Sequence, residues 1–250
     1  MSHPGLSLQL YTVRDAVAAD LPGTLRRIAA IGFRDIEPWG FAPREAEFAA
    51  AFAETGLSAP SAHAPVIASD DPAALFASAR RLGVQTLIDP HYPGDQWSTR
   101  EAVEAIAAKL NELAKVGADA GVAFGYHNHW FELEPRLDGV PALEVLADLL
   151  DDDVVLEVDT YWAQVGGVDP VGLLQRLGER VRFIHVKDGP PSRDPADQVA
   201  VADGGMDIAG ILAAAPQARR VAELDDTRGD IWTAVERSYA ALAAEAEGAA

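Results

Sequence analysis

The sequence predicts an α/β protein of the (β/α)8 type, a closed TIM barrel, from its periodicity, its glycines and its even composition. Eight short apolar runs of strand character alternate with Ala- and Leu-rich segments of helical spacing. Glycines stand where helix C-caps are expected, at Gly32, Gly56, Gly83 and Gly121. No linker, charge block or low-complexity segment marks a second domain, so residues 1–250 are expected to form a single TIM-barrel domain.

The elements follow one another in regular strand and helix pairs. The expected strands cover residues 6–10, 33–36, 58–62, 84–88, 122–126, 154–158, 181–186 and 220–224, and the expected helices cover residues 21–31, 43–55, 71–82, 98–120, 140–150, 167–176, 207–214 and 230–246. An open Rossmann-like sheet is the alternative. It is disfavoured because no G-x-G-x-x-G follows the first strand and no P-loop sequence occurs.

Charge and composition narrow the class of protein. The formal net charge of −19 argues against nucleic-acid binding, which depends on clustered Lys and Arg. No cysteine is present, so disulfides and thiolate metal sites are excluded. No apolar run approaches 18 residues and no signal sequence is evident at the N-terminus, so we expect a cytoplasmic protein without a membrane partner. The oligomeric state stays open, with a homo-oligomer as one alternative.

Polar side chains gather where the expected strands end. In a (β/α)8 barrel the active site lies at the carboxyl ends of the strands. Five of the six histidines stand at these ends, and His3 is the exception. The full set is Gln9, Tyr11, Glu37, Trp39, His63, Asp89, His91, His127, His129, Glu157, Asp159, Tyr161, His185, Lys187, Asp188, Glu223 and Asp225. This distribution predicts a polar pocket with aromatic walls.

Three of these residues suggest a divalent metal site. Asp159, His185 and Glu223 end the sixth, seventh and eighth strands, which are neighbours in a barrel. Carboxylate oxygens combined with an imidazole nitrogen suit Mn, Mg or Co, with Zn as a further candidate. The alternative for any one of them is a structural role, since Asp at a helix entrance is an ordinary N-cap.

Several motifs resemble a known family. The segments "LQLYTVRD", "TLRRIAAIGFRDIE", "GYHNHWFELE", "EVDTYWAQVGG", "IHVKDG" and "AELDD" are spread over nearly the whole chain. Together they resemble the xylose isomerase-like TIM-barrel superfamily of sugar phosphate isomerases and epimerases, which includes inosose isomerases and dehydratases, and the YHNH sequence is typical of one subgroup. The resemblance implies one divalent ion held by a Glu, Asp, His, Glu set, of which Asp159, His185 and Glu223 are the last three.

The chain departs from the epimerase pattern at three places. His127 stands where those enzymes have the first glutamate ligand, so either His127 or Glu132 completes the metal site, and we favour Glu132. "VADGGMD" is similar to the family's glycine-rich loop but has Ala202 in a glycine position. The second glutamate of the epimerase acid–base pair would have to be Glu37 or Glu157.

The predicted chemistry is removal of a proton next to a carbonyl. A divalent ion stabilises the developing enolate, and a histidine serves more readily than a carboxylate as the base at neutral pH. The predicted catalytic residues are His127, His129 and Glu37, and the predicted substrate contacts are His63, Lys187, Trp39 and Tyr161, with His91 and Trp162 as further candidates. Barrel-rim packing is the alternative for the aromatic residues.

These residues favour a keto-sugar isomerase or epimerase that works through an enediolate. A lyase or dehydratase acting on a keto sugar or keto-inositol is the main alternative, because elimination needs a proton shuttle more than a second base. A non-catalytic sugar-binding barrel comes third. A DNA-repair endonuclease of the same superfamily is disfavoured, since the chain is strongly acidic.

Overall fold

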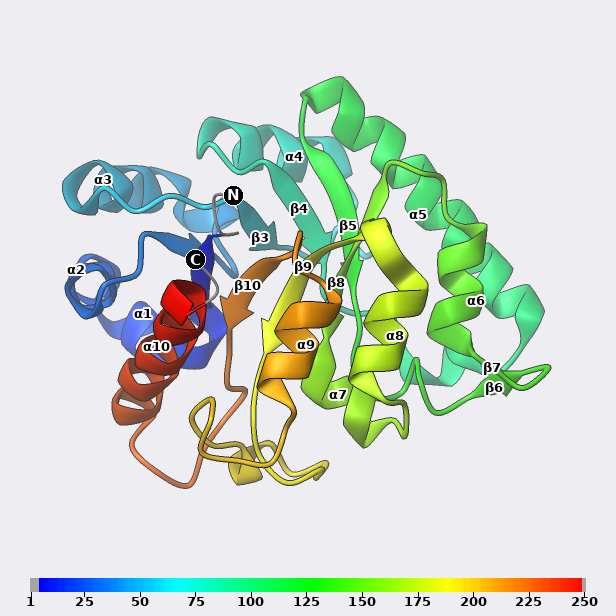
Figure 1. The fold of residues 1–250 in the computed structure, drawn as a ribbon. Coiled ribbons are helices and arrows are strands. Elements are labelled where there is room, and N and C mark those ends of the chain that lie inside the picture. The colour runs from blue at the N-terminus through cyan, green and yellow to red at the C-terminus, as the bar shows by residue number, and fades with distance from the viewer. Residues whose placement is uncertain (1–4, 249–250) are drawn as a thin grey trace.

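The computed structural model describes residues 5–248 and shows eight parallel strands that curl into a barrel surrounded by helices (Figure 1). The strand order is β2-β1-β10-β9-β8-β5-β4-β3. The two ends of this sheet meet through single bridges from Asp35 to Ser58 and from Trp39 to His63. The predicted (β/α)8 class is therefore confirmed, while His3 lies outside the described residues.

The bounds of the elements are as follows. The barrel strands are β1 (Leu6–Gln9), β2 (Asp35–Glu37), β3 (Ser61–His63), β4 (Thr86–Asp89), β5 (Ala123–His127), β8 (Val154–Asp159), β9 (Val181–Val186) and β10 (Arg219–Ala222). A small hairpin is formed by β6 (Arg136–Leu137) and β7 (Val140–Pro141). The helices are α1 (Arg14–Ala19), α2 (Leu21–Ile31), α3 (Glu45–Thr55), α4 (Pro72–Arg81), α5 (Arg100–Ala120), α6 (Ala142–Leu149), α7 (Thr160–Val165), α8 (Pro170–Leu177), α9 (Ile208–Ala214) and α10 (Ile231–Gly248).

The structure shifts some predicted bounds for identifiable reasons. Helix α2 has the predicted ends, because Asp20 caps its first turn by accepting a hydrogen bond from the Gly23 N–H. Strand β3 begins three residues later than predicted, since Pro60 has no N–H to donate to a neighbouring strand. Hairpin β6–β7 and helices α1 and α7 were not predicted.

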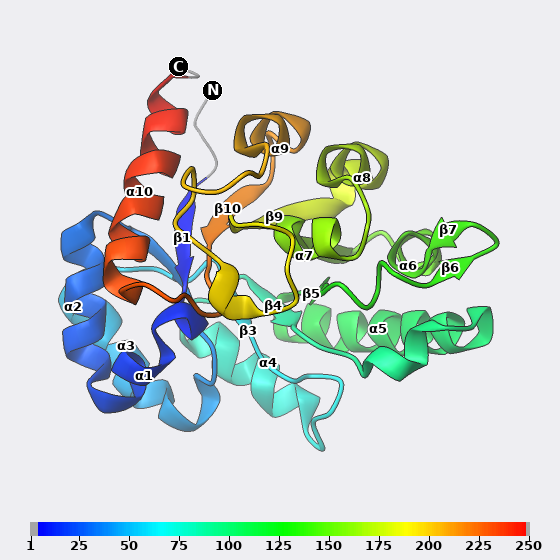
Figure 2. The same cartoon turned by 90° about the horizontal axis from the view of Figure 1, so that it is seen from below.

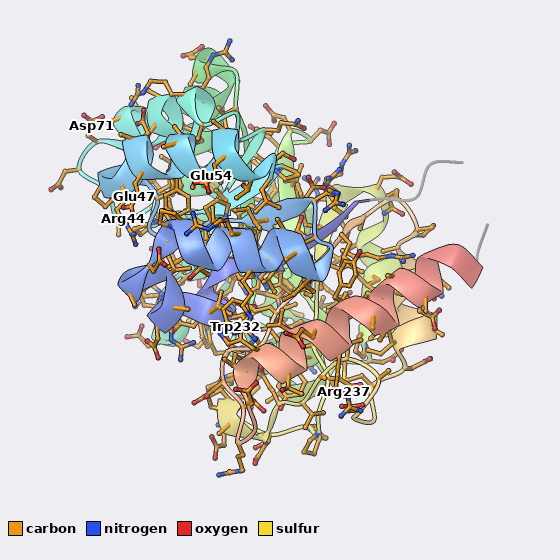
Figure 3. The ribbon with its side chains drawn as sticks, turned by 90° about the vertical axis from the view of Figure 1, so that its left-hand side faces the viewer. Arg44, Glu47, Glu54, Asp71, Trp232 and Arg237 are labelled. Carbon is orange, nitrogen blue, oxygen red and sulfur yellow. The ribbon has the colours of Figure 1, made fainter. Side chains whose placement is uncertain are left out.

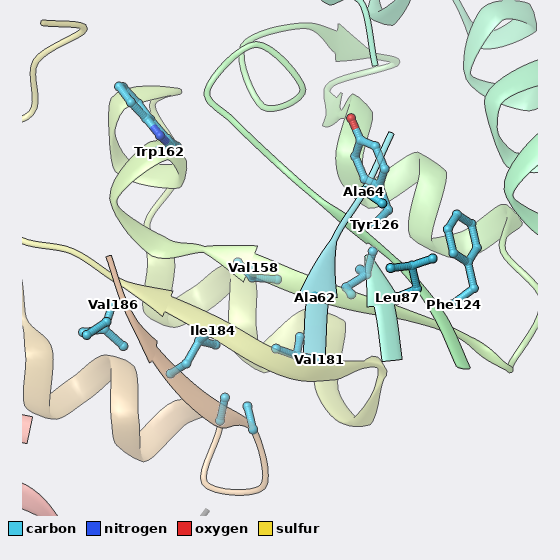
Figure 4. Close-up of a cluster of buried hydrophobic side chains, with 14 of the residues drawn as sticks. Ala62, Ala64, Leu87, Phe124, Tyr126, Val158, Trp162, Val181, Ile184 and Val186 are labelled. Carbon is cyan, nitrogen blue, oxygen red and sulfur yellow. The ribbon is translucent and has the colours of Figure 1, made fainter. Parts of the chain in front are cut away.

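Apolar side chains fill both sides of the barrel wall. Leu87, Phe124, Val158 and Ile184 are fully or almost fully buried in the main core cluster between strands and helices (Figure 4). Inside the barrel, a separate apolar cluster of Ile88, Phe183 and Val221 forms with partly buried Val155. Because side chains alternate along a strand, polar residues two or more positions further along the same strands lie above this cluster.

Helix α10 packs beside α2 on the outside of the barrel (Figure 3). The Arg27 guanidinium lies 4.1 Å from the ring centroid of Trp232, and its Nη2 is 3.3 Å from a carboxylate oxygen of Glu236. Tyr239 donates a hydrogen bond to the Gly32 carbonyl at the end of α2. Across the described part of the chain, every helix is too short or too polar to cross a lipid bilayer.

A long segment between β9 and α9 lies across the end at which the strands finish (Figure 2). Asp188 holds this segment in place. Its two carboxylate oxygens accept hydrogen bonds from four backbone N–H groups, those of Gly189, Ala202, Gly204 and Met206. The predicted strand-end residue Asp188 thus organises the loop.

Ala202 in this segment has a left-handed backbone with φ of 72°. A Cβ atom disfavours that conformation, and glycine carries no such penalty. We expect Ala202→Gly to raise the free energy of unfolding by about 1 kcal/mol, as measured by urea denaturation. The control is Ala209→Gly on the exposed side of α9, which should lower it by about 0.5–1 kcal/mol. If both changes lowered the free energy of unfolding by the same amount, the left-handed backbone at Ala202 would not be strained.

Candidate active site

Asp159, His185 and Glu223 come together at the carboxyl ends of β8, β9 and β10, and we call them the upper group. Donor atoms from all three lie within 4.8 Å of one another. His185 Nδ1 is 2.6 Å from Glu223 Oε2 and 3.9 Å from Asp159 Oδ2. Asp159 uses Oδ1 to accept the Trp162 N–H at the start of α7, while its buried Oδ2 faces the ammonium of Lys187. Oδ1 of Asp159 therefore caps the helix, whereas Oδ2 lies beside a cationic group and could bind a metal ion in its place.

The ammonium of Lys187 lies against the same carboxylates. Lys187 Nζ is 2.9 Å from Asp159 Oδ2, 2.7 Å from Glu223 Oε2 and 2.5 Å from Asp225 Oδ2. Burial would lower the pKa of Lys187, but the three carboxylates raise it well above its ordinary value. Lys187 is therefore positively charged near pH 7, next to the upper group.

A second set of donors lies deeper in the barrel, and we call His63, His127, Glu157 and His185 the deep group. Their donor atoms also lie within 4.8 Å of one another, and all four residues are buried. Glu157 Oε2 is 2.5 Å from His63 Nε2, 3.1 Å from His185 Nε2 and 3.2 Å from His127 Nδ1. Burial alone would raise the pKa of Glu157, yet His185 and His63 hold it well below its usual range.

His185 belongs to both groups through its two ring nitrogens. Nδ1 faces Glu223, whereas Nε2 faces Glu157 and lies 2.9 Å from Glu37 Oε1. Gln9 donates a hydrogen bond to the same Glu37 oxygen, at 2.7 Å. Burial would lower the pKa of His185, but Glu157 and Glu223 raise it well above its ordinary value.

A cavity of about 170 Å³ opens above these groups. Its lining residues are Tyr11, Trp39, Pro90 and Glu223, together with His63, His91, His127, His129 and Asp225. Trp39 is 45% exposed and its ring packs edge-on against Tyr11, with centroids 5.4 Å apart. Neither Arg nor Lys occurs among the described residues that line the cavity.

The comparisons with known proteins agree with this architecture. The family description "xylose isomerase-like TIM barrel" matches residues 25–219.

The chain belongs to the xylose isomerase-like TIM-barrel family. A sugar phosphate isomerase/epimerase from Parabacteroides distasonis has the same fold, with a TM-score of 0.80 at 22% identity over 96% of this chain and 98% of that one. The IOLI protein, whose crystal structure holds a zinc atom, has a TM-score of 0.75 at 14% identity over 98% of both chains.

Several curated proteins that are similar to this chain are named inosose dehydratase. Inosose dehydratase 2 of Bacillus cereus is 28% identical over 116 residues, which are 46% of this chain and 38% of the relative. The chain therefore matches well under half the length of this relative. Further curated matches carry the name inosose dehydratase as well.

His129 lines the cavity and is partly exposed. Burial, followed by the nearby His127 and Lys187, holds the pKa of His129 well below its ordinary value. Its ring stacks on Phe131 with an interplanar angle of 7°. Burial and His185 also lower the pKa of His127, to about 3. Both imidazoles are therefore neutral near pH 7, but His127 forms part of the cavity floor within the deep group.

Glu132, the predicted fourth ligand, lies outside both groups. Its Oε1 accepts a hydrogen bond from the Tyr126 hydroxyl and its Oε2 accepts one from the His129 N–H, each at 2.8 Å. Burial raises its pKa to about 8. The structure instead brings His127, the other candidate for this role, next to His185. We propose that Glu132 positions His129.

The shifted pKa of Glu132 makes stability depend on pH. The folded chain keeps the Glu132 proton that the unfolded chain releases at its ordinary pKa of 4.5. The free energy of unfolding is therefore expected to fall as pH rises from about 4.5 to about 8, by an amount on the order of a few kcal/mol. Glu132→Gln should flatten this fall in urea denaturation at pH 5, 6.5 and 8, whereas Glu112→Gln on the exposed side of α5 should leave it unchanged.

Three other predicted site residues, Glu37, Lys187 and Tyr161, do not line the cavity. Glu37 is fully buried beneath the cavity and does not reach its lining, and Lys187 is 1% exposed among its carboxylates. Tyr161 donates its hydroxyl to the carbonyls of Pro190 and Ser192 in the loop that crosses the barrel, so it does not line the cavity. Trp162 lies against Lys187, with Nζ 5.6 Å from the ring centroid.

Two positioning residues received no role from the sequence, although Asp89 was among the predicted strand-end residues. Asn128 is buried and joins β5 to β8, because its Oδ1 accepts the Asp159 N–H and its Nδ2 donates to the Asp159 carbonyl. Its signal was its place between the two histidines of the YHNH motif. Asp89 accepts the backbone N–H groups of Ile67 and His91 and thereby orders the segment that carries His91.

Proposed function

We propose that this chain is a divalent-metal-dependent dehydratase that eliminates water from a keto-inositol or an unphosphorylated keto sugar. The observation that carries the proposal is that histidines line the cavity, among them the neutral and partly exposed His129, whereas both glutamates suited to an epimerase pair lie below it. Glu37 and Glu157 are fully buried and are held by His63 and His185. The names of the curated relatives support elimination.

The elimination needs a base and a route for the same proton to the leaving group. His129 Nδ1 is buried without a partner, so Nε2 is the nitrogen available to substrate. We propose that Nε2 takes the proton from the carbon next to the carbonyl and passes it to the neighbouring hydroxyl on the same face. The carbon–oxygen bond breaks, the hydroxyl leaves as water, and His129 returns to its neutral form. Positioned proton transfer of this kind contributes about 10²–10⁴-fold to a rate.

Other residues bind and orient the substrate. Trp39 and Tyr11 offer an aromatic wall, and the carboxylates of Glu223 and Asp225 face the cavity as acceptors for sugar hydroxyls. A divalent ion held by the buried histidine and carboxylate donors would supply Lewis-acid polarisation of the substrate carbonyl. Mn, Mg or Co, with Zn as a further candidate, stay predictions for the upper group, as does the cytoplasmic location, and the oligomeric state stays open.

An isomerase or epimerase is the second candidate, favoured by a second histidine, His91, beside His129 at the cavity. The rings of His91 and His129 are 5.9 Å apart and both residues line it. Two imidazoles could add and remove protons at adjacent carbons without loss of water.

Incubation of metal-loaded protein with a panel of keto-inositols and keto sugars in deuterated water, followed by NMR, tests the proposal. Loss of water from one member is the expected result. Deuterium exchange with all hydroxyls retained would instead establish the isomerase or epimerase. Absence of both exchange and water loss across the panel would contradict both functions.

A further inference from the structure

We propose that a cavity at the amino ends of the barrel strands is a binding site for a phosphate group. We call it the amino-end cavity. Its volume of about 360 Å³ lies within the range of about 300–1,000 Å³ that is usual for small-molecule sites. Its lining comes from the start of β1, the turn between α2 and β2, Arg220 of β10 and the C-terminal part of α10. The candidate active site lies at the other ends of these strands, so the two sites are separate.

Arg220 occupies a position on β10 that usually holds an apolar side chain. Side chains alternate between the two faces of a strand, and Val221 faces the barrel interior, where it packs with Ile88 and Phe183. Arg220 therefore faces outward, into the layer between β10 and the helices, and it is 8% exposed. Arginine is rarely buried to this extent unless it is paired.

The guanidinium of Arg220 lacks such a pair among the side chains that the structure describes. Its Nη1 is buried and makes no hydrogen bond, and no described carboxylate forms an ion pair with it. Burial lowers the pKa of Arg220, and the charge of Glu245 partly offsets this shift. A buried guanidinium without a counter-charge costs free energy, so this position favours the binding of an anion.

Arg34 adds a second guanidinium to the lining. Its Nη1 donates to two backbone carbonyls in the turn after α2, at 3.4 and 3.1 Å, and no carboxylate within the described part of the chain pairs with it. Asp35 supplies the carboxylate of the described lining, and this group already accepts hydrogen bonds from Ser58 and Arg219. The amino-end cavity therefore has an excess of positive charge in a chain whose formal net charge is −19.

The two guanidiniums favour phosphate over a carboxylate. One guanidinium can bind both oxygens of a carboxylate as a bidentate pair, which leaves no oxygen for the other. A phosphate group has further oxygens and a second negative charge, so it can bind both Arg34 and Arg220. Phe33 and Tyr239, whose ring centroids are 4.8 Å apart, form an apolar wall of the same cavity. This combination suits inorganic phosphate or the phosphate ester of a small organic molecule.

Isothermal titration calorimetry with inorganic phosphate and with glucose 6-phosphate, in chloride buffer of constant ionic strength, tests the proposal. We expect the wild-type chain to bind one equivalent. Arg220→Met should weaken this binding at least about 10-fold, because it removes charge-assisted hydrogen bonds. Tighter binding of glucose 6-phosphate would identify an ester as the ligand, and tighter binding of inorganic phosphate would identify the free ion. Failure of the wild-type chain to bind either compound would overturn the proposal.

Arg182→Met is the matched control. Arg182 is exposed on β9 and does not line the amino-end cavity, so this change removes the same charge from the protein but should leave phosphate binding unchanged. An equal weakening of binding by Arg182→Met and Arg220→Met would mean that phosphate is attracted only by net charge. That result would rule out the site, as would an unchanged affinity in Arg220→Met.

Urea denaturation gives a readout that does not depend on calorimetry. In phosphate-free buffer Arg220→Met should be at least as stable as the wild-type chain, because it replaces an unpaired buried charge with an apolar side chain. Phosphate stabilises proteins in general, so we expect it to raise the unfolding midpoint of both chains, and of the wild-type chain more. A marked loss of stability in Arg220→Met without phosphate would show that another group of the chain already pairs with Arg220, which contradicts the anion site.

This inference can fail without the proposed function failing. Neither measurement uses a metal ion or a keto sugar. Phosphate binding that depends on Arg220, in a chain that dehydrates no member of the panel, would support the amino-end cavity and remove the dehydratase. Water loss by a chain that binds no phosphate would do the reverse.

Discussion

Replacement of His129 by glutamine is expected to lower kcat for the dehydration by about 10²–10⁴-fold while KM changes little. Glutamine keeps much of the shape of the imidazole and can still form hydrogen bonds, but it cannot take up a proton near pH 7. The stacking of the ring on Phe131 and the hydrogen bond from the His129 N–H to Glu132 position the backbone and side chain before substrate binds. Steady-state kinetics on the substrate identified by the NMR panel measures both constants.

His91→Gln is the matched control, because His91 lines the same cavity and its ring lies 5.9 Å from that of His129. If His91 only binds substrate, its loss raises KM more than it lowers kcat. Solvent deuterium exchange adds a second readout. A His129→Gln variant that still exchanges deuterium into substrate at the wild-type rate would show that another group is the base.

The sequence was sufficient for the fold because helix and strand periods are local. Helix α2 was predicted with its observed ends, since its capping Asp20 and closing Gly32 are both visible in the chain. The bounds of β3 were missed because strand ends depend on which neighbour supplies hydrogen bonds. Ser58 makes only a single bridge to Asp35, so the predicted pairing of the second and third strands is too short there to count Ser58 within β3.

The sequence predicted which residues belong to the site better than it predicted how deep in the barrel each of them lies. Alternation along β8 shows that Glu157 and Asp159 point to the same side of the sheet, but not how high each lies in the barrel. Height depends on the stagger between strands, and β8 shifts register against β9 at Leu156 and Glu157. The sequence therefore gave no sign that Glu157 would meet His63, which lies on the other side of the barrel interior.

Residues beyond the strand ends were hardest to place. Tyr161 lies in the first turn of α7, and its direction depends on how the chain turns after Asp159. The turn carries its hydroxyl to Pro190 and Ser192. The place of Glu132 was equally hard to predict. Its two oxygens accept hydrogen bonds from the Tyr126 hydroxyl and the His129 N–H only because of how the loop after β5 folds.

Replacement of Lys187 by methionine is expected to have the largest effect on stability. Methionine fills a similar volume but leaves the carboxylates of Asp159, Glu223 and Asp225 without the ammonium that pairs with all three. Removing one partner of a buried ion pair costs about 3–5 kcal/mol. We expect a loss of this size in the free energy of unfolding, measured by urea denaturation at pH 7 in the presence of EDTA.

The same change should make the upper group a better cation site. Once the ammonium is gone, a divalent ion can take its place among the oxygens, so Mg²⁺ or Mn²⁺ should restore much of the stability lost by Lys187→Met and should bind it more tightly than the wild-type chain. Lys115→Met is the control, because that side chain is 71% exposed and lies 3.9 Å from Asp151, and its loss should cost no more than about 0.5 kcal/mol. A loss for Lys187→Met that is the same with and without divalent ions would mean that packing, and not the charge of Lys187, stabilises this end of the barrel.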